Sequence, residues 1–190
     1  MFRRILFVCV FAVCLGWTCQ LAMAQEVVHA LTGTVSSIDP VGKTITVFLD
    51  GGSQGVFKGM TNSKTSLSVD KKLLAAATTA DAFNKNGAYV IVFYFGGTDA
   101  RTAVALRSLG TGPFTAMEGT VARTESHDHA ISVQDKSGAV QTFKLNADTV
   151  AESYSGALDG LKFQAQKDGH VRVVGTSQNG DLVALFVSER

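Results

Sequence analysis

The chain has 190 residues, with 17 Lys and Arg against 16 Asp and Glu, so its formal net charge is +1 at pH 7. This balance leaves no basic excess with which to hold a polyanion and argues against nucleic-acid binding. All three cysteines and the single tryptophan lie within the first 19 residues. The rest of the chain therefore has neither a disulfide nor a thiolate metal site.

The first 24 residues have the pattern of a cleavable secretory signal peptide. Arg3 and Arg4 precede an apolar run over residues 5–15, and Ala22-Met23-Ala24 supplies small residues at the two positions that signal peptidase reads. The apolar run is too short to span a membrane. We expect cleavage after Ala24, a periplasmic or secreted protein, and no transmembrane segment after the signal is removed. Without the two arginines the chain has 15 basic and 16 acidic residues, a net charge of −1.

Residues 25–110 predict a first unit made mostly of β-strands. Segments rich in β-branched residues, separated by Asp-Pro and Gly-Gly turns, indicate strands over residues 30–38, 43–49 and 55–60. A helix is expected over residues 71–84, because Asp70 can cap its first turn. Its apolar residues fall near one face: Leu73, Leu74, Ala77, Ala80 and Phe83. Two more strands are expected over residues 88–95 and 101–109.

Residues 111–113 indicate a short linker, and residues 114–190 predict a second unit with the same order of elements. The strands expected in it cover residues 114–124, 130–134, 139–145, 161–164, 170–174 and 182–187. Val150, Tyr154 and Leu158 are spaced by four, which indicates a short helix over residues 148–158.

The two units also match each other in sequence. Gly33-Thr34-Val35 matches Gly119-Thr120-Val121 at an offset of 86, and Phe57-Lys58 matches Phe143-Lys144 at the same offset. Later matches, such as the Val-Ala-Leu that begins at Val104 and again at Val183, have an offset of 79. The conserved order of the matches and the single change of offset favour an internal duplication.

Three strands, a helix and two strands is the order of the five-stranded OB barrel, which binds oligonucleotides and oligosaccharides. The expected fold is mainly β with one or two short helices, arranged as two tandem OB-like five-stranded barrels. A different small barrel or a sandwich would give nearly the same order. The repeated Gly-Thr-Val, the Lys-x-Gly-x-x-Val step over residues 85–90 and the closing Val-Ala-Leu resemble small exported bacterial domains of unknown function, often found in tandem. The resemblance implies an envelope or secreted β-barrel protein and carries over no functional residues.

Residues 88–95 are apolar or aromatic at almost every position, without the alternation of a strand that has one wet face. One interpretation, which we favour, is a central strand whose second face is covered by the helix or by the other unit. The other is an exposed aromatic face that binds a partner or a glycan. Its candidate binding residues are Tyr89, Phe93, Tyr94 and Phe95. The absence of tryptophan after residue 24 argues against glycans.

His127-Asp128-His129 is the one local cluster that could hold a metal ion, because residues two apart in an extended segment point the same way. A solvated hairpin turn is the simpler interpretation, because two histidines alone do not make a metal site and no third ligand is identifiable in the sequence. His29 or His170 could supply one only if the fold brought it close. The acidic residues at turns, Asp50 among them, are expected to be solvated. No serine lies in a Gly-x-Ser-x-Gly elbow.

These observations predict a non-enzymatic, exported binding or accessory module of the bacterial cell envelope. Its partner would be a protein or a polysaccharide of the envelope, and no cofactor is expected. A metal-binding exported protein that uses His127 and His129 is the second hypothesis, and an unrecognised hydrolase is the third.

Overall fold

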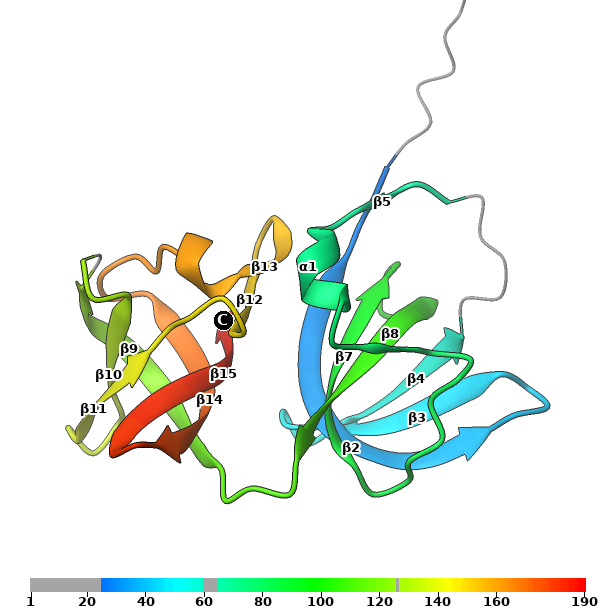
Figure 1. The fold of residues 1–190 in the computed structure, drawn as a ribbon, viewed down its shortest axis with the longest axis horizontal. Helices are drawn as coiled ribbons and strands as arrows, with labels where there is room; N and C mark the ends of the chain where they lie inside the picture. The colour runs from blue at the N-terminus through cyan, green and yellow to red at the C-terminus, as the bar shows by residue number, and fades with distance from the viewer. Residues whose placement is uncertain (1–24, 60–64, 126) are drawn as a thin grey trace, which may run out of the picture.

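The structure, a computed structural model, describes residues 25–59, 65–125 and 127–190 and contains two β units side by side (Figure 1). The predicted signal peptide lies outside the described residues, as do Met60 of the third predicted strand and Ser126 beside the histidines. Within the described residues, no helix has the length and apolar character needed to cross a membrane.

The first unit is a six-stranded sheet in the order β4-β3-β2-β7-β8-β6. Its strands are β2 (His29–Asp39), β3 (Thr44–Leu49), β4 (Gln54–Gly59), β6 (Thr78–Thr79), β7 (Tyr89–Phe95) and β8 (Arg101–Gly110). β4 also pairs in parallel with β8 over Phe57–Gly59. A separate parallel pair joins β1 (Glu26–Val27) to β5 (Leu67–Ser68).

The second unit contains a closed five-stranded barrel in the order β11-β10-β9-β14-β15, which closes where Lys144 of β11 pairs with Val183 of β15. Its strands are β9 (Thr115–Glu125), β10 (Ala130–Gln134), β11 (Val140–Lys144), β14 (His170–Gln178) and β15 (Asp181–Glu189). A hairpin of β12 (Val150–Ser153) and β13 (Gly156–Asp159) extends the sheet beside β15.

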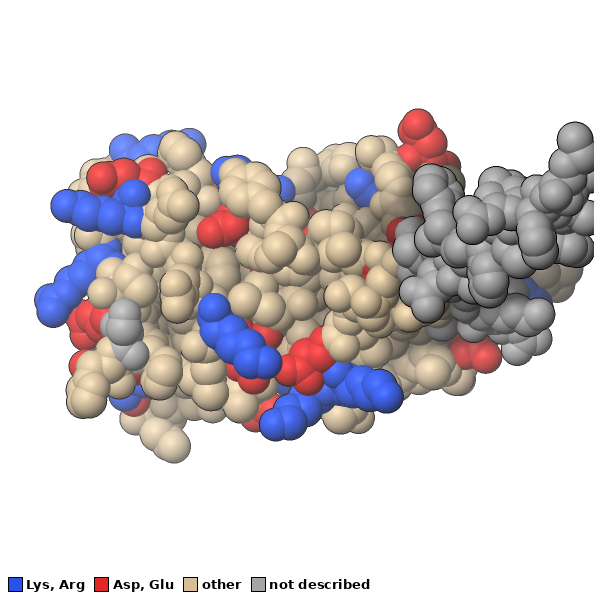
Figure 2. Space-filling view, turned by 90° about the horizontal axis from the view of Figure 1, so that it is seen from above, with Lys and Arg blue, Asp and Glu red and all other residues tan. Residues whose placement is uncertain are grey.

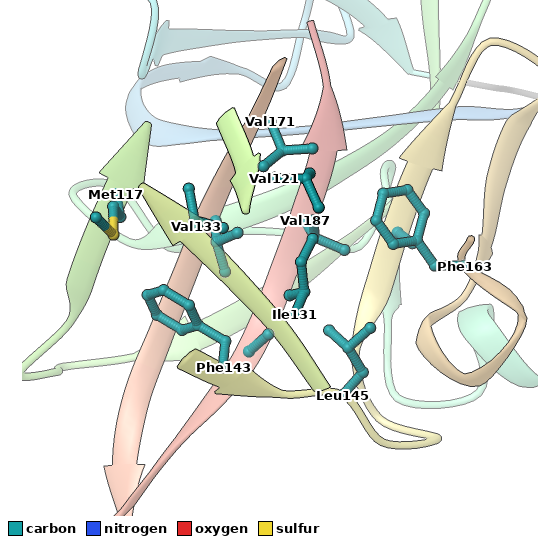
Figure 3. Packing of buried hydrophobic residues seen from close by; sticks show 12 residues of the cluster. Met117, Val121, Ile131, Val133, Phe143, Leu145, Phe163, Val171 and Val187 are labelled. Atoms are coloured by element: carbon teal, nitrogen blue, oxygen red, sulfur yellow. The ribbon is translucent and has the colours of Figure 1, made fainter. Parts of the chain in front are cut away.

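The barrel of the second unit is filled by apolar side chains that alternate along its strands (Figure 3). Val121, Ile131, Val133 and Phe143 are fully buried, while Met117 and Phe163 retain 7% and 6% exposure. Burial of one such side chain contributes about 1.5–3 kcal/mol, so period-two alternation is enough to determine which face of each strand turns inward.

The prediction of a mainly β chain is confirmed, and most expected strands agree with the structure to within a few residues. The expected linker at residues 111–113 falls between β8 and β9.

The helix expected over residues 71–84 is wrong in its length. Asp70 does cap a helix, accepting from the backbone N–H of Lys72, but α1 spans only Lys71–Leu74. The chain then turns, and β6 pairs with β8. The apolar residues serve two separate clusters: Leu73, Leu74 and Ala77 pack towards the second unit, whereas Ala80 and Phe83 enter the core of the first. One straight helix would not reach both.

The helix expected over residues 148–158 is wrong, because this segment forms the β12–β13 hairpin. Val150 pairs with Phe186 of β15, and Leu158 pairs with Ala151 across the hairpin. Val150 and Leu158 lie in the two strands and Tyr154 lies in the turn between them, so their spacing of four residues does not reflect a helix here. The strand expected over residues 161–164 is also wrong: the chain makes a 3-10 turn, η1 (Gly160–Lys162), capped by Asp159.

Candidate functional site

Strand β7, which holds the predicted aromatic binding face, is covered on both sides. It lies between β2 and β8. Val90 and Val92 face the core of the first unit. Ile91 and Phe93 face a second cluster, here called the inter-unit core, which the two units build together. Its buried members are Val28, Ala30, Leu73, Ile91, Phe93, Val104 and Ala105 from the first unit and Val150, Val174 and Phe186 from the second.

Phe93 is therefore a core residue, with no exposed surface, and its assignment to an exposed binding face is wrong. The second unit covers the face of β7 that the sequence leaves apolar, as the favoured interpretation of the strand expects. Tyr94 packs edge-on against Phe57 at 5.5 Å and lies 5.4 Å from the Arg101 guanidinium. Phe95 is partly buried against the inter-unit core.

Tyr89 is the fourth predicted residue, and it takes part in a polar cluster at the junction of the units. Its hydroxyl donates to Asp50 Oδ2 at 2.5 Å, and Thr32 Oγ1 donates to the same oxygen at 2.6 Å. Arg172 of β14 reaches this oxygen from the second unit at 2.9 Å. Burial, and then the hydrogen bond to Asp50, raise the pKa of Tyr89 to about 12.

Asp50 is thus not the solvated turn residue that the sequence suggests. Its side chain is 14% exposed and that of Arg172 is 15% exposed. The Nε of Arg172 is buried without a hydrogen-bond partner in the part of the chain that the structure describes. A partly buried ion pair of this kind contributes little net stability, because the cost of removing both charges from water offsets much of their attraction.

A second polar contact joins the units near the other end of the β2–β7 pair, where His29 pairs with Tyr94. Glu152 of β12 lies 2.6 Å from His29 Nδ1 through Oε1, and its Oε2 accepts from the backbone N–H of Ala30 at 2.7 Å. Burial raises the pKa of Glu152, although both partners oppose that shift. Lys162 and Asp70 add an exposed ion pair at 2.9 Å. Apolar and polar contacts together join the units.

The first unit contains a groove of about 770 Å³ between the β2–β3 turn and the loop that follows β6. Its floor contains the buried side chains of Ile45, Ala80 and Phe83. Its rim is polar, with Asp39, Lys43, Asp81 and Asn84. An apolar floor with a few polar groups at the rim is the usual construction of a ligand site.

The charged groups of the rim are held in place by local bonds. Asp39 Oδ1 accepts from the backbone N–H groups of Val41 and Gly42 at 3.0 and 2.9 Å. A hydrogen bond from Thr79 lowers the pKa of Asp81, and Lys43 lowers it further. Both carboxylates are therefore already used within their own loops, which suits binding better than acid–base chemistry.

His127, Asp128 and His129 form an exposed turn between β9 and β10. His129 adopts φ +47°, and its carbonyl accepts from the N–H of Leu145. His29, one of the two possible third ligands, is instead paired with Glu152. No group of three or more His, Cys, Asp or Glu residues that could hold a metal ion occurs within residues 25–59, 65–125 and 127–190.

The inter-unit contacts and the groove were not found by sequence reasoning. Glu152 and His29 are 123 residues apart, and no short motif marks such a pair. The only signal for the inter-unit core is the uninterrupted apolar run of β7. Comparison with protein-family models gives no match, and comparison with curated proteins gives none either.

Proposed function

We propose that this chain is an exported, non-enzymatic binding module of the bacterial cell envelope that holds its partner in the groove of the first unit. The observation that carries the proposal is the groove itself, which has a volume of about 770 Å³ and an apolar floor, in a unit whose aromatic strand is already covered. The apolar floor favours a segment of a partner protein over a polysaccharide.

We further propose that the two units are OB-like barrels that arose by duplication. The strand orders β4-β3-β2-β7-β8 and β11-β10-β9-β14-β15 correspond, and a parallel pair joins the outer strands of each. The backbone bonds at the repeated Gly-Thr-Val agree in detail. The N–H of Val35 donates to the carbonyl of Ala88, and the carbonyl of Val35 accepts from the N–H of Gly87. In the second unit, the N–H of Val121 donates to the carbonyl of Gly169, and its carbonyl accepts from the N–H of Asp168.

These bonds support a different alignment of the later strands from the one that sequence matches suggest. Asp168 and Gly169 lie 81 positions after Gly87 and Ala88, against the offset of 79 read from the sequence. The same steric constraint explains why both motifs begin with glycine. A Cβ on Gly33 would lie 2.4 Å from the carbonyl oxygen of Phe48, and one on Gly119 would lie 2.0 Å from that of Gln134.

The groove is tested by blocking it. Ala82 lies on the exposed rim, and Ala82→Trp would fill the groove, whereas Ala76 is an exposed alanine outside it and Ala76→Trp is the matched control. The processed protein and both variants are melted with a panel of apolar peptides, cell-wall glycan fragments and divalent metals. We expect a peptide to raise the Tm of the wild type and of Ala76→Trp but not of Ala82→Trp.

Two outcomes would contradict the proposal. A ligand that stabilises all three proteins equally binds outside the groove. If no member of the panel changes the Tm of the wild type, the groove does not have the role assigned to it.

A further inference from the structure

Tyr154 is an aromatic residue that the protein does not use for its own packing. It lies at the tip of the β12–β13 hairpin, and 87% of it is exposed. The hairpin itself is well fixed, because β12 pairs with β15 and the N–H of Ala157 donates to the carbonyl of Val28 in the first unit at 2.8 Å. A rigid element thus presents a free aromatic ring to solvent.

The ring borders a pocket of about 310 Å³, here called the Tyr154 pocket. The hairpin contributes Ser153 and Ser155 to it, and the neighbouring segments contribute Gln166, His170, Glu189 and Arg190. The hairpin and the C-terminal end of the described chain lie near each other in the centre of the molecule (Figure 1). One aromatic face therefore stands beside hydroxyl, amide, imidazole, carboxylate and guanidinium groups.

We propose that the Tyr154 pocket is a subsite for one ring of a saccharide. A sugar ring has an apolar face of C–H groups and an edge of hydroxyls that both donate and accept hydrogen bonds. The Tyr154 ring can cover the apolar face. Gln166 can donate and accept, Glu189 accepts and Arg190 donates, so a row of hydroxyls finds partners of both kinds. This site is separate from the groove and goes beyond the function proposed for it.

Other ligand classes fit the Tyr154 pocket less well. Glu189 is the one acidic side chain among the described residues that line it, and glycoside hydrolysis ordinarily needs two facing carboxylates. Glu152, the nearest candidate along the hairpin, points instead to His29 and Ala30. The pocket contains Arg190 and Glu189 together, and acidic and basic side chains are interspersed over the face shown in Figure 2, which does not suit a polyanion.

The test uses the processed protein and soluble tetrasaccharides as probes, with and without N-acetyl groups, titrated by calorimetry and by NMR. Tyr154→Ala removes the ring, whereas Tyr154→Phe keeps it. Val41, 93% exposed in the first unit, supplies the control Val41→Ala. We expect at least one tetrasaccharide to bind the wild type, Val41→Ala and Tyr154→Phe with similar affinity and Tyr154→Ala about tenfold more weakly.

In the NMR titration, the amide signals of Tyr154, Gln166 and Glu189 should move on addition of the binding tetrasaccharide, and the signals of Gln166 and Glu189 in Tyr154→Ala should need about tenfold more of it to move as far. The proposal is overturned if none of the tetrasaccharides binds at millimolar concentration, or if Tyr154→Ala binds as well as the wild type. Tyr154 is exposed at a hairpin tip, so these variants are expected to fold, and unchanged spectra of the free proteins check this.

Discussion

The hydroxyl of Tyr89 supports the Asp50 carboxylate that links the two units. The Tyr89 hydroxyl donates a hydrogen bond to Asp50. The same carboxylate accepts a hydrogen bond from Thr32 and forms an ion pair with Arg172 of the other unit. Loss of a hydrogen bond to a charged, partly buried group costs about 1.5–3 kcal/mol. Tyr89→Phe should therefore lower the free energy of unfolding by that amount in urea titrations. Tyr154→Phe, at an exposed tyrosine, is the matched control and should leave it unchanged. Equal effects of the two variants would show that Asp50 does not depend on Tyr89.

Glu152 gives the inter-unit contact a dependence on pH. Burial raises its pKa above the 4.5 of a free glutamate side chain, Glu189 adds to this rise, and the hydrogen bond with His29 opposes it. The folded protein therefore takes up a proton at a higher pH than the unfolded chain. The stability that this group contributes is full below pH 4.5 and is lost as the pH rises through the folded pKa.

The variant Glu152→Gln isolates that contribution. The free energy of unfolding of the wild type, minus that of Glu152→Gln, should increase as the pH falls from neutrality towards 4. Urea titrations at several pH values measure it. A difference that stays constant over this range would mean that Glu152 has an ordinary pKa in the folded protein.

The elements divide into those that sequence patterns determine and those that tertiary contacts determine. β10, with alternating Ile131 and Val133 inside the barrel, agrees with its prediction residue for residue, because alternation and the two flanking turns are local properties of the sequence. The 71–84 segment was predicted as one helix because its apolar spacing fits a period of 3.6. Its residues are shared between two cores, and that division is visible only when both units are in place.

The candidate site follows the same rule. Sequence reasoning located β7 and favoured a strand covered on its second face, yet it also offered Phe93 as a candidate binding residue, and Phe93 lies in the inter-unit core. The groove and the Tyr154 pocket each join segments that are far apart in the chain, such as Lys43 with Asp81 and Tyr154 with Glu189. The spacing of residues along the sequence does not predict such tertiary contacts.

At the strand level, the Gly-Thr-Val motif has a testable steric origin. A Cβ at residue 119 would meet a backbone oxygen at 2.0 Å, and a backbone atom can yield less than a flexible side chain. Gly119→Ala should lower stability by about 1–3 kcal/mol, as overpacking does. Gly97 has open space around it, so Gly97→Ala is the control and should have little effect. Thermal melts of the two variants compare them, and equal melting temperatures would show that the strands can separate without cost.

For the whole molecule, the proposed export has a direct consequence. If residues 1–24 are a signal peptide, the protein recovered from a bacterium that expresses the full chain should begin at Gln25. N-terminal sequencing and intact mass both measure this, and recovery of a chain that retains its first 24 residues would contradict export by this route.

The shared core has a consequence for unfolding. Two units that only touch would melt independently, whereas two units that bury Phe93, Val150 and Phe186 in one cluster lose that cluster together. Scanning calorimetry of the processed protein tests this most directly. The inter-unit core predicts one transition, with the calorimetric enthalpy equal to the van't Hoff enthalpy. Two separable transitions would contradict it.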